Sequence, residues 1–229
     1  MKVFVLLAWY DEPVESLKRA VASCAGLADH LIATDGRYRL FPGKTISRQS
    51  EANVIRRACY EHGIGLTLTI PTEPWESETA KRTAHFRLAE ALGTPYEDWL
   101  IALDGDEELH YQQEFKGHLE GSPHDVLAVR CEQAEKEMNE TEDALTTLGT
   151  DRAAVYYRGF CLRLQRDMRV EWPTHWQFSG MNRDGNRVRL DDSTPAEGLK
   201  IVHYNLQRTM ERKQAKAEYV SARNASGQS

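Results

Sequence analysis

Residues 99–108 read Trp-Leu-Ile-Ala-Leu-Asp-Gly-Asp-Glu-Glu, so five apolar residues run directly into four carboxylates, with one glycine between the first two. A short apolar run that ends in a turn is typical of a buried strand in a parallel sheet covered on both faces. Open α/β sheets bind ligands just outside the carboxyl ends of their strands, where these carboxylates fall. Asp104 and Asp106 can both reach one hard cation, and such a cation can grip a diphosphate. The alternative is a solvated acidic turn that caps the next helix, because turns favour Asp and Gly.

The composition is that of an ordinary globular protein. The 229 residues are 41% hydrophobic and 28% charged, which is enough to bury a sizeable core. A formal net charge of −6 argues against a general nucleic-acid binder, which needs a basic surface opposite the phosphates. We therefore expect no nucleic-acid partner, although this total leaves room for one basic pocket.

The cysteines and the apolar segments bear on the compartment. Cys24, Cys59, Cys131 and Cys161 are scattered without a C-x-x-C pair, which predicts buried free thiols in a reducing compartment and not a zinc site. The apolar run of residues 3–9 is too short for a signal peptide and lacks a small-residue cleavage site. No segment approaches the roughly 18 apolar residues that span a membrane. The sequence thus predicts a cytoplasmic protein without a transmembrane segment.

Short apolar runs alternate with helical periodicities through the first 131 residues. The expected strands are residues 3–8, 30–34, 66–70, 99–103 and 125–130, and the expected helices are 14–26, 52–63 and 80–93. Strands that alternate with helices in this way predict an α/β domain with a mainly parallel sheet flanked by helices.

The second half of the chain has a different character. An acidic run at residues 132–143 indicates a solvated loop or an exposed helix, and short strands are expected at 155–164, 168–172 and 199–203. We interpret the whole chain, 1–229, as one domain in which residues 132–204 form an α+β extension on the same sheet as residues 1–131. A charged helix at 205–223 and a disordered tail at 224–229 complete the prediction.

Ligand-type side chains follow several of the expected strands. The four clusters are Trp9-Tyr10-Asp11-Glu12, Asp35-Gly36, the set Glu78, Lys81 and Arg82, and Asp104-Gly105-Asp106. Each has an ordinary explanation when it is taken alone, as a surface aromatic, a turn or a solvated helix face. Their joint placement at or just after the carboxyl ends of strands predicts one site.

The ordered set of a strand, Tyr10-Asp11-Glu12, a helix, a strand, Thr34-Asp35-Gly36, and later Asp104-Gly105-Asp106 resembles the family 2 glycosyltransferases of the GT-A fold. The segments 161–166 and 169–172 with His175 are similar to the acceptor-side region of many members, and 201–204 resembles their late strand. The resemblance covers residues 3–110 well and 160–210 loosely. The loop at residues 37–45 is longer than in many members, and Arg37 stands where a serine is usual.

The resemblance implies a role for each matching residue. Tyr10 and Glu12 would border the nucleotide base and ribose, and Asp35 would hydrogen-bond one of them. Asp104 would lie near the sugar or ribose and, with Asp106 and His203, would form the site of a Mn²⁺ or Mg²⁺ ion that bridges the diphosphate. Lys81 and Arg82 would help to grip the phosphates or the ribose.

The implied activity is metal-dependent, inverting transfer of a sugar from a nucleoside-diphosphate donor to a hydroxyl of a glycan, small molecule or protein. Inverting transfer requires a carboxylate that takes the proton of the attacking hydroxyl. Glu171, Glu142 and Asp143 are candidates by position, and Glu171 is our choice.

Two other functions stay open from the sequence. A nucleotidyltransferase on a related fold also uses paired carboxylates and a cation, but it usually has a glycine-rich basic loop where this chain reads Trp9-Tyr10-Asp11-Glu12-Pro13. A non-catalytic carbohydrate- or protein-binding module that kept the fold is the second alternative.

Overall fold

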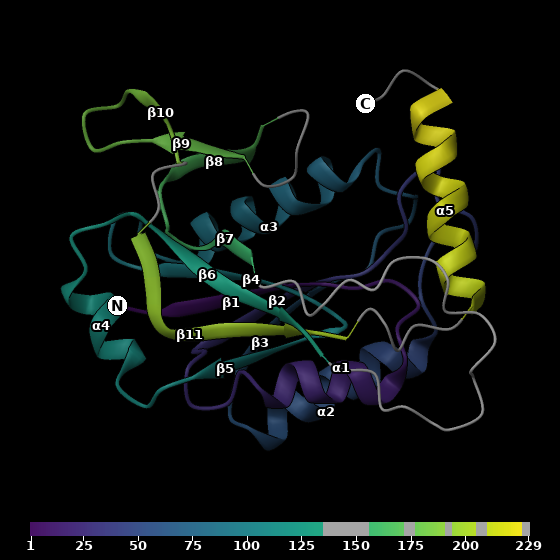
Figure 1. Ribbon diagram of the computed structural model, residues 1–229, viewed down its shortest axis with the longest axis horizontal. Coiled ribbons are helices and arrows are strands. Elements are labelled where there is room, and N and C mark those ends of the chain that lie inside the picture. The colour runs from purple at the N-terminus through teal and green to yellow at the C-terminus, as the bar shows by residue number, and fades with distance from the viewer. Residues whose placement is uncertain (135–155, 172–176, 191–193, 205–209, 226–229) are drawn as a thin grey trace.

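The protein is seen in a computed structural model that describes residues 1–134, 156–171, 177–190, 194–204 and 210–225. Eight strands form one sheet in the order β3-β2-β1-β4-β7-β6-β11-β5, and three more form a small second sheet in the order β10-β9-β8 (Figure 1). The strands of the large sheet are β1 (Val3–Ala8), β2 (His30–Thr34), β3 (Gly65–Thr69), β4 (Trp99–Asp104), β5 (Glu107–Tyr111), β6 (Val126–Gln133), β7 (Tyr156–Arg163) and β11 (Thr194–His203). The small sheet contains β8 (Arg166–Val170), β9 (Phe178–Met181) and β10 (Arg187–Arg189). The helices are α1 (Val14–Ala22), α2 (Gln49–Glu61), α3 (Glu78–Leu92), α4 (Phe115–Gly121) and α5 (Met210–Ala225).

Strand β1 lies inside the large sheet and is buried on both faces. It pairs in parallel with β2 on one side and with β4 on the other. Its side chains alternate between two hydrophobic clusters, as the period of two in a strand requires. Val5 and Leu7 pack with α1 and α2, whereas Phe4 and Leu6 pack with α3 on the opposite face. This double burial explains why the strand is a continuous apolar run.

The predicted α/β class is confirmed. The first four strands, β3-β2-β1-β4, pair in parallel, and helices cover both faces of the sheet. Residues after 131 add β7 and β11 to the same sheet, where the pairs β4–β7, β6–β7 and β5–β11 are antiparallel.

Three details of the prediction are corrected. The acidic residues Glu107 and Glu108 open strand β5, which pairs antiparallel with β11, so the acidic stretch turns back into the sheet. Strands β9 and β10 were not predicted, because each is only three or four residues long. Helix α5 continues to Ala225, so residues 224–225 are helical and not part of a disordered tail. The remaining tail residues 226–229, with Glu142, Asp143 and His175, lie outside the described residues.

All four cysteines are free and buried, as the sequence predicted. Burial raises the pKa of the Cys24 and Cys59 thiols to about 12, so neither is a thiolate near neutral pH. Among the helices that the structure describes, none is long and apolar enough to cross a membrane.

His85 on α3 is a buried imidazole whose protonation opposes folding. Burial, followed by the charges of Lys81 and Arg82, lowers the pKa of His85 from 6.5 to about 3. In the unfolded chain this imidazole therefore binds a proton as the pH falls through 6.5. In the folded chain it binds a proton only near pH 3. The contribution of this neutral side chain to stability is complete above pH 6.5 and is lost as the pH falls toward 3.

We expect acid destabilisation that depends on His85. Between pH 8 and pH 5 the free energy of unfolding should fall by about 2 kcal/mol on account of this residue alone. His85→Gln removes the titration, so urea unfolding at the two pH values should show that much less loss in the variant. An equal loss in the wild type and the variant would refute this role of His85.

Candidate active site

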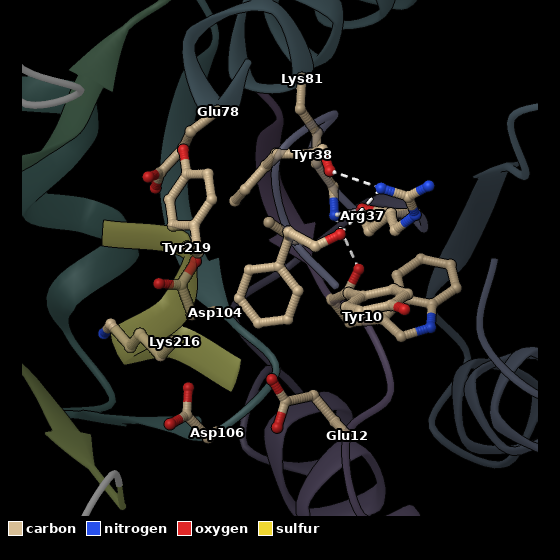
Figure 2. Close-up of a pocket in the computed structure, with 14 residues that line it drawn as sticks. Tyr10, Glu12, Arg37, Tyr38, Glu78, Lys81, Asp104, Asp106, Lys216 and Tyr219 are labelled. Atoms are coloured by element: carbon tan, nitrogen blue, oxygen red, sulfur yellow. Dashed lines mark hydrogen bonds between the residues drawn. The ribbon is translucent and has the colours of Figure 1, made fainter. Parts of the chain in front are cut away.

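A cavity of about 730 Å³, measured with the space at its mouth, lies at the carboxyl ends of β1 and β4 (Figure 2). The parallel register places Ala8 of β1 beside Thr34 of β2 and Asp104 of β4, so the three strands end at one level. Five segments line the cavity: the end of β1 with the residues after it, the loop after β2, helix α3, the end of β4 with the turn after it, and helix α5. Its position is where an open α/β sheet binds ligands.

The glycine of the Asp104-Gly105-Asp106 turn allows the turn to approach the segment after β1. The Gly105 amide donates to the carbonyl of Ala8 at 2.9 Å. A side chain on Gly105 would bring its Cβ within 2.8 Å of Cγ of Glu12 and 3.1 Å of Cβ of Trp9. Because nothing larger than glycine fits without displacement, this spacing of the two aspartates is tied to the position of Glu12. Glu12 and Asp106 are both buried at the cavity wall, with 4% of each residue exposed.

Asp104 is held by a buried arginine. Nη2 of Arg82 lies 2.9 and 3.2 Å from the two carboxylate oxygens of Asp104, and the same guanidinium bonds Glu78 at 3.1 Å. Burial alone lowers the pKa of Arg82, but the two carboxylates raise it above its usual value, so the guanidinium stays charged. Arg82 does not line the cavity. Its observed role is to orient Asp104 and Glu78, and the predicted grip on phosphates or ribose stays a prediction.

Lys81 joins the ends of two strands. Its Nζ donates to the carbonyl of Trp9 at 2.7 Å and to that of Gly36 at 2.9 Å, and only 1% of the residue is exposed. Burial lowers the pKa of Lys81 to about 7, although Asp35 acts in the opposite direction. Lys81 lines the cavity, as the sequence predicted, but two of its N–H bonds serve the backbone.

Asp35 fastens the loop that follows β2. Its carboxylate accepts from the amide and the hydroxyl of Ser47 at 2.9 and 2.5 Å, and its carbonyl accepts from the indole of Trp75 at 2.7 Å. The side chain is buried, and Asp35 is not among the residues that line the cavity. The predicted hydrogen bond to a base or ribose therefore has no support in this arrangement and stays a prediction.

Aromatic rings line the cavity together with the carboxylates. Tyr10, after β1, contacts Phe41 edge-on with 5.6 Å between ring centroids, and its hydroxyl donates to the Lys44 carbonyl at 2.7 Å. Tyr219 of α5 contacts both Tyr38 and Phe41 at 5.6 Å. The sequence pattern indicated Tyr10 as a site residue. It did not indicate four other residues that line the cavity: Tyr38, Phe41, Lys216 and Tyr219. Two aromatic residues inside a polar loop, and a lysine and a tyrosine three residues apart on a helix, were the available signals.

The predicted cation site is only partly assembled. Nε2 of His203 lies 3.2 Å from Oδ2 of Asp106, and Nδ1 of His203 lies 3.2 Å from the amide nitrogen of Gln133. Asp104 is engaged by Arg82, and within the described ranges no three His, Cys, Asp or Glu side chains are arranged to hold a metal ion. The structure thus brings Asp106 and His203 together as hydrogen-bond partners, and a cation at this position stays a prediction.

Glu171, the predicted catalytic base, lies just after β8 in the region of the small sheet. Its carboxylate accepts a hydrogen bond from the hydroxyl of Ser179, which also accepts from Arg187 at 2.8 Å. Glu171 is not among the residues that line the cavity. The structure does not bring it together with the other predicted site residues, and its catalytic role stays a prediction.

No protein-family model and no curated protein matches this chain. Among solved structures, TarS of S. aureus is similar over 60% of this chain and 23% of its own, with 13% identity and a TM-score of 0.44. A 4-diphosphocytidyl-2C-methyl-D-erythritol synthase is similar over 71% of this chain and 75% of its own, with 10% identity and a TM-score of 0.38. This chain thus spans less than a quarter of the TarS chain, and neither likeness identifies an activity.

Lys81→Met should destabilise the protein by about 1–3 kcal/mol, because two buried carbonyls lose their donor. Lys18→Met on the exposed surface of α1 is the matched control and should change stability by less than about 0.5 kcal/mol. Urea unfolding at pH 8 measures both variants. If the two substitutions have the same small effect, Lys81 is not a tie between the strand ends.

Proposed function

We propose that this protein is a glycosyltransferase that binds a nucleoside-diphosphate sugar in the cavity and transfers the sugar to a hydroxyl acceptor. The observation that carries the proposal is that Glu12, Asp104 and Asp106 line one cavity with several aromatic rings at the carboxyl ends of β1 and β4.

The aromatic rings and the carboxylates of the cavity suit two different parts of such a donor. Aromatic rings stack on any nucleobase, and each such stack contributes about 1–3 kcal/mol. Carboxylates accept hydrogen bonds from the hydroxyls of a ribose or a sugar, and Arg82 holds Asp104 in position for this. We assign Tyr10 and the loop aromatics to the base side, and Glu12 and Asp104 to the hydroxyls.

We further propose that transfer depends on Mn²⁺ or Mg²⁺ held by Asp106 and His203. When bound, the cation would neutralise charge that develops on the departing nucleoside diphosphate. In the arrangement seen, the Gln133 amide donates to Nδ1 of His203, so Nε2 carries a proton toward Asp106, and binding of the cation would displace that proton. An inverting course follows from the resemblance to family 2 glycosyltransferases. It requires a carboxylate base, and Glu171 is proposed for that role from the sequence alone.

The first test is a thermal-shift titration with UDP, GDP, dTDP, CDP and ADP, each with and without Mn²⁺. A ligand at one hundred times its Kd stabilises the native state by about 2.7 kcal/mol, which raises Tm by about 5–10 °C in a chain of this size. We expect such a shift for at least one diphosphate, and we expect it to require Mn²⁺ and to vanish in Asp106→Asn. Asp184→Asn, an exposed residue in the turn between β9 and β10, is the isosteric control and should behave as the wild type.

The products distinguish the proposal from its rivals. A glycosyltransferase releases nucleoside diphosphate from the matching nucleotide sugar, whereas a nucleotidyltransferase releases pyrophosphate from a nucleoside triphosphate and a sugar phosphate. A response to diphosphate without either release would favour the non-catalytic module. A flat response to all five diphosphates would exclude the proposed donor.

A further inference from the structure

The cationic side chains that line the cavity differ in the hydrogen bonds that they already make within the protein. Three cationic side chains line it: Arg37, Lys81 and Lys216. Nη1 of Arg37 donates to the carbonyls of Tyr38, Arg39 and Phe41 at 3.2, 2.9 and 2.8 Å, and Lys81 donates to two other carbonyls. Lys216 makes no hydrogen bond or ion pair within the part of the chain that the structure describes. It is therefore the lining cation with its full donor capacity available to a ligand.

Lys216 and Tyr219 lie on the same face of α5, because residues three apart on a helix are neighbours. Both line the cavity, and Lys216 is drawn on the side of Asp104 and Asp106 (Figure 2). Tyr219 meets the rings of Tyr38 and Phe41 in the loop after β2. The C-terminal helix thus brings one cation and one ring to a cavity whose other walls come from the first 106 residues.

Helix α5 stands at the edge of the molecule and not in the core (Figure 1). Its side chains are mainly exposed, and Met210 keeps 76% of its surface in contact with solvent. The ring of Tyr219 contacts Tyr38 and Phe41 in the body of the protein. Because the described side chains of the helix are mostly exposed, we expect a ligand that adds contacts to the helix to raise its local stability.

The loop that receives Tyr219 is firmly built. Arg37 bonds three carbonyls within it, Ser47 bonds Asp35, and Trp75 exchanges backbone hydrogen bonds with Arg37 and Arg39. The rings of Tyr38 and Phe41 are therefore presented by a rigid support. Of the two partners in this contact, α5 is the one whose position a ligand can alter.

We propose that α5 is a clamp for the diphosphate of the donor, in which Lys216 pairs with the phosphates and Tyr219 docks the helix on Tyr38 and Phe41. The inference rests on the proposed function and extends it to a segment outside the carboxylate motif. A diphosphate near Asp104 and Asp106 needs positive charge beside it, and Lys216, which lies on the side of these two aspartates, supplies it. Binding should therefore order α5, and the docked helix should slow release of the nucleotide.

The affinity test uses Lys216→Met with Lys213→Met as the matched control. Lys213 is an exposed lysine on the same helix that does not line the cavity. The probe is whichever of UDP, GDP, dTDP, CDP and ADP binds the wild type with Mn²⁺, and its Kd is measured by calorimetry beside that of the corresponding nucleoside. Lys216→Met should weaken diphosphate binding about tenfold, as expected for loss of a charge-assisted bond, and should leave nucleoside binding unchanged. Equal diphosphate affinities of the two variants, or an equal loss for the nucleoside, would overturn the assignment of Lys216.

The docking test measures backbone hydrogen exchange of α5 with and without the same diphosphate. Exchange over residues 210–225 should slow on binding in the wild type and in Tyr219→Phe, which keeps the ring. It should not slow in Tyr219→Ala, while protection in β1 and β4 is retained. Unchanged exchange of α5 in the wild type would overturn the clamp. A wild type that binds none of the five diphosphates overturns the proposed function itself, whereas normal binding with Lys216→Met overturns only this inference.

Discussion

The site depends on the hydrogen-bonded register of β1 between β2 and β4. This pairing ends three strands at the level of Ala8, Thr34 and Asp104, so the segments that follow them emerge side by side. The register is firmly specified because β1 is buried on both faces, and a slip by one residue would exchange the residues that face α3 with those that face α1. The amide of Gly105 then bonds the last carbonyl of β1, which draws the acidic turn onto Glu12.

Two adjacent cations of α3 secure this junction from inside the protein. Burying a charge is costly unless hydrogen bonds and opposite charges compensate for the loss of water. Arg82 has two carboxylates, whereas Lys81 has mainly carbonyls, and this difference explains why the pKa of Arg82 rises while that of Lys81 falls to about 7. Both residues were expected to hold a substrate. In the structure they bond to protein groups that line the cavity or lie beside it. The positive charge available to an anionic ligand comes from elsewhere in the chain.

The sequence was sufficient where the pattern is local. Continuous apolar runs and helical periodicity identified β1 to β4 and α1 to α3, and the carboxyl ends of those strands located Glu12, Lys81, Asp104 and Asp106 in one cavity. It was insufficient where long-range packing decides the outcome. Strand β5 begins with two glutamates, which disfavour strands on their own, and it exists because β11 supplies a partner. In the same way, nothing near Asp35 indicates that Ser47, twelve residues later, occupies its carboxylate.

The aromatic rings of the cavity are the clearest example of a feature that depends on contacts between distant segments of the chain. Tyr38 and Phe41 belong to the loop after β2, and Tyr219 lies near the end of the chain. A charged helix with a single tyrosine is predicted from its sequence to be exposed. Its part in the cavity follows only from its contact with the loop after β2. The same contact bears on the chemistry, because the four lining carboxylates repel an anionic ligand unless positive charge accompanies it. If the ligand is a diphosphate, the proposed cation and Lys216 would together supply that charge, and specificity would then depend on the C-terminal helix as much as on the two aspartates.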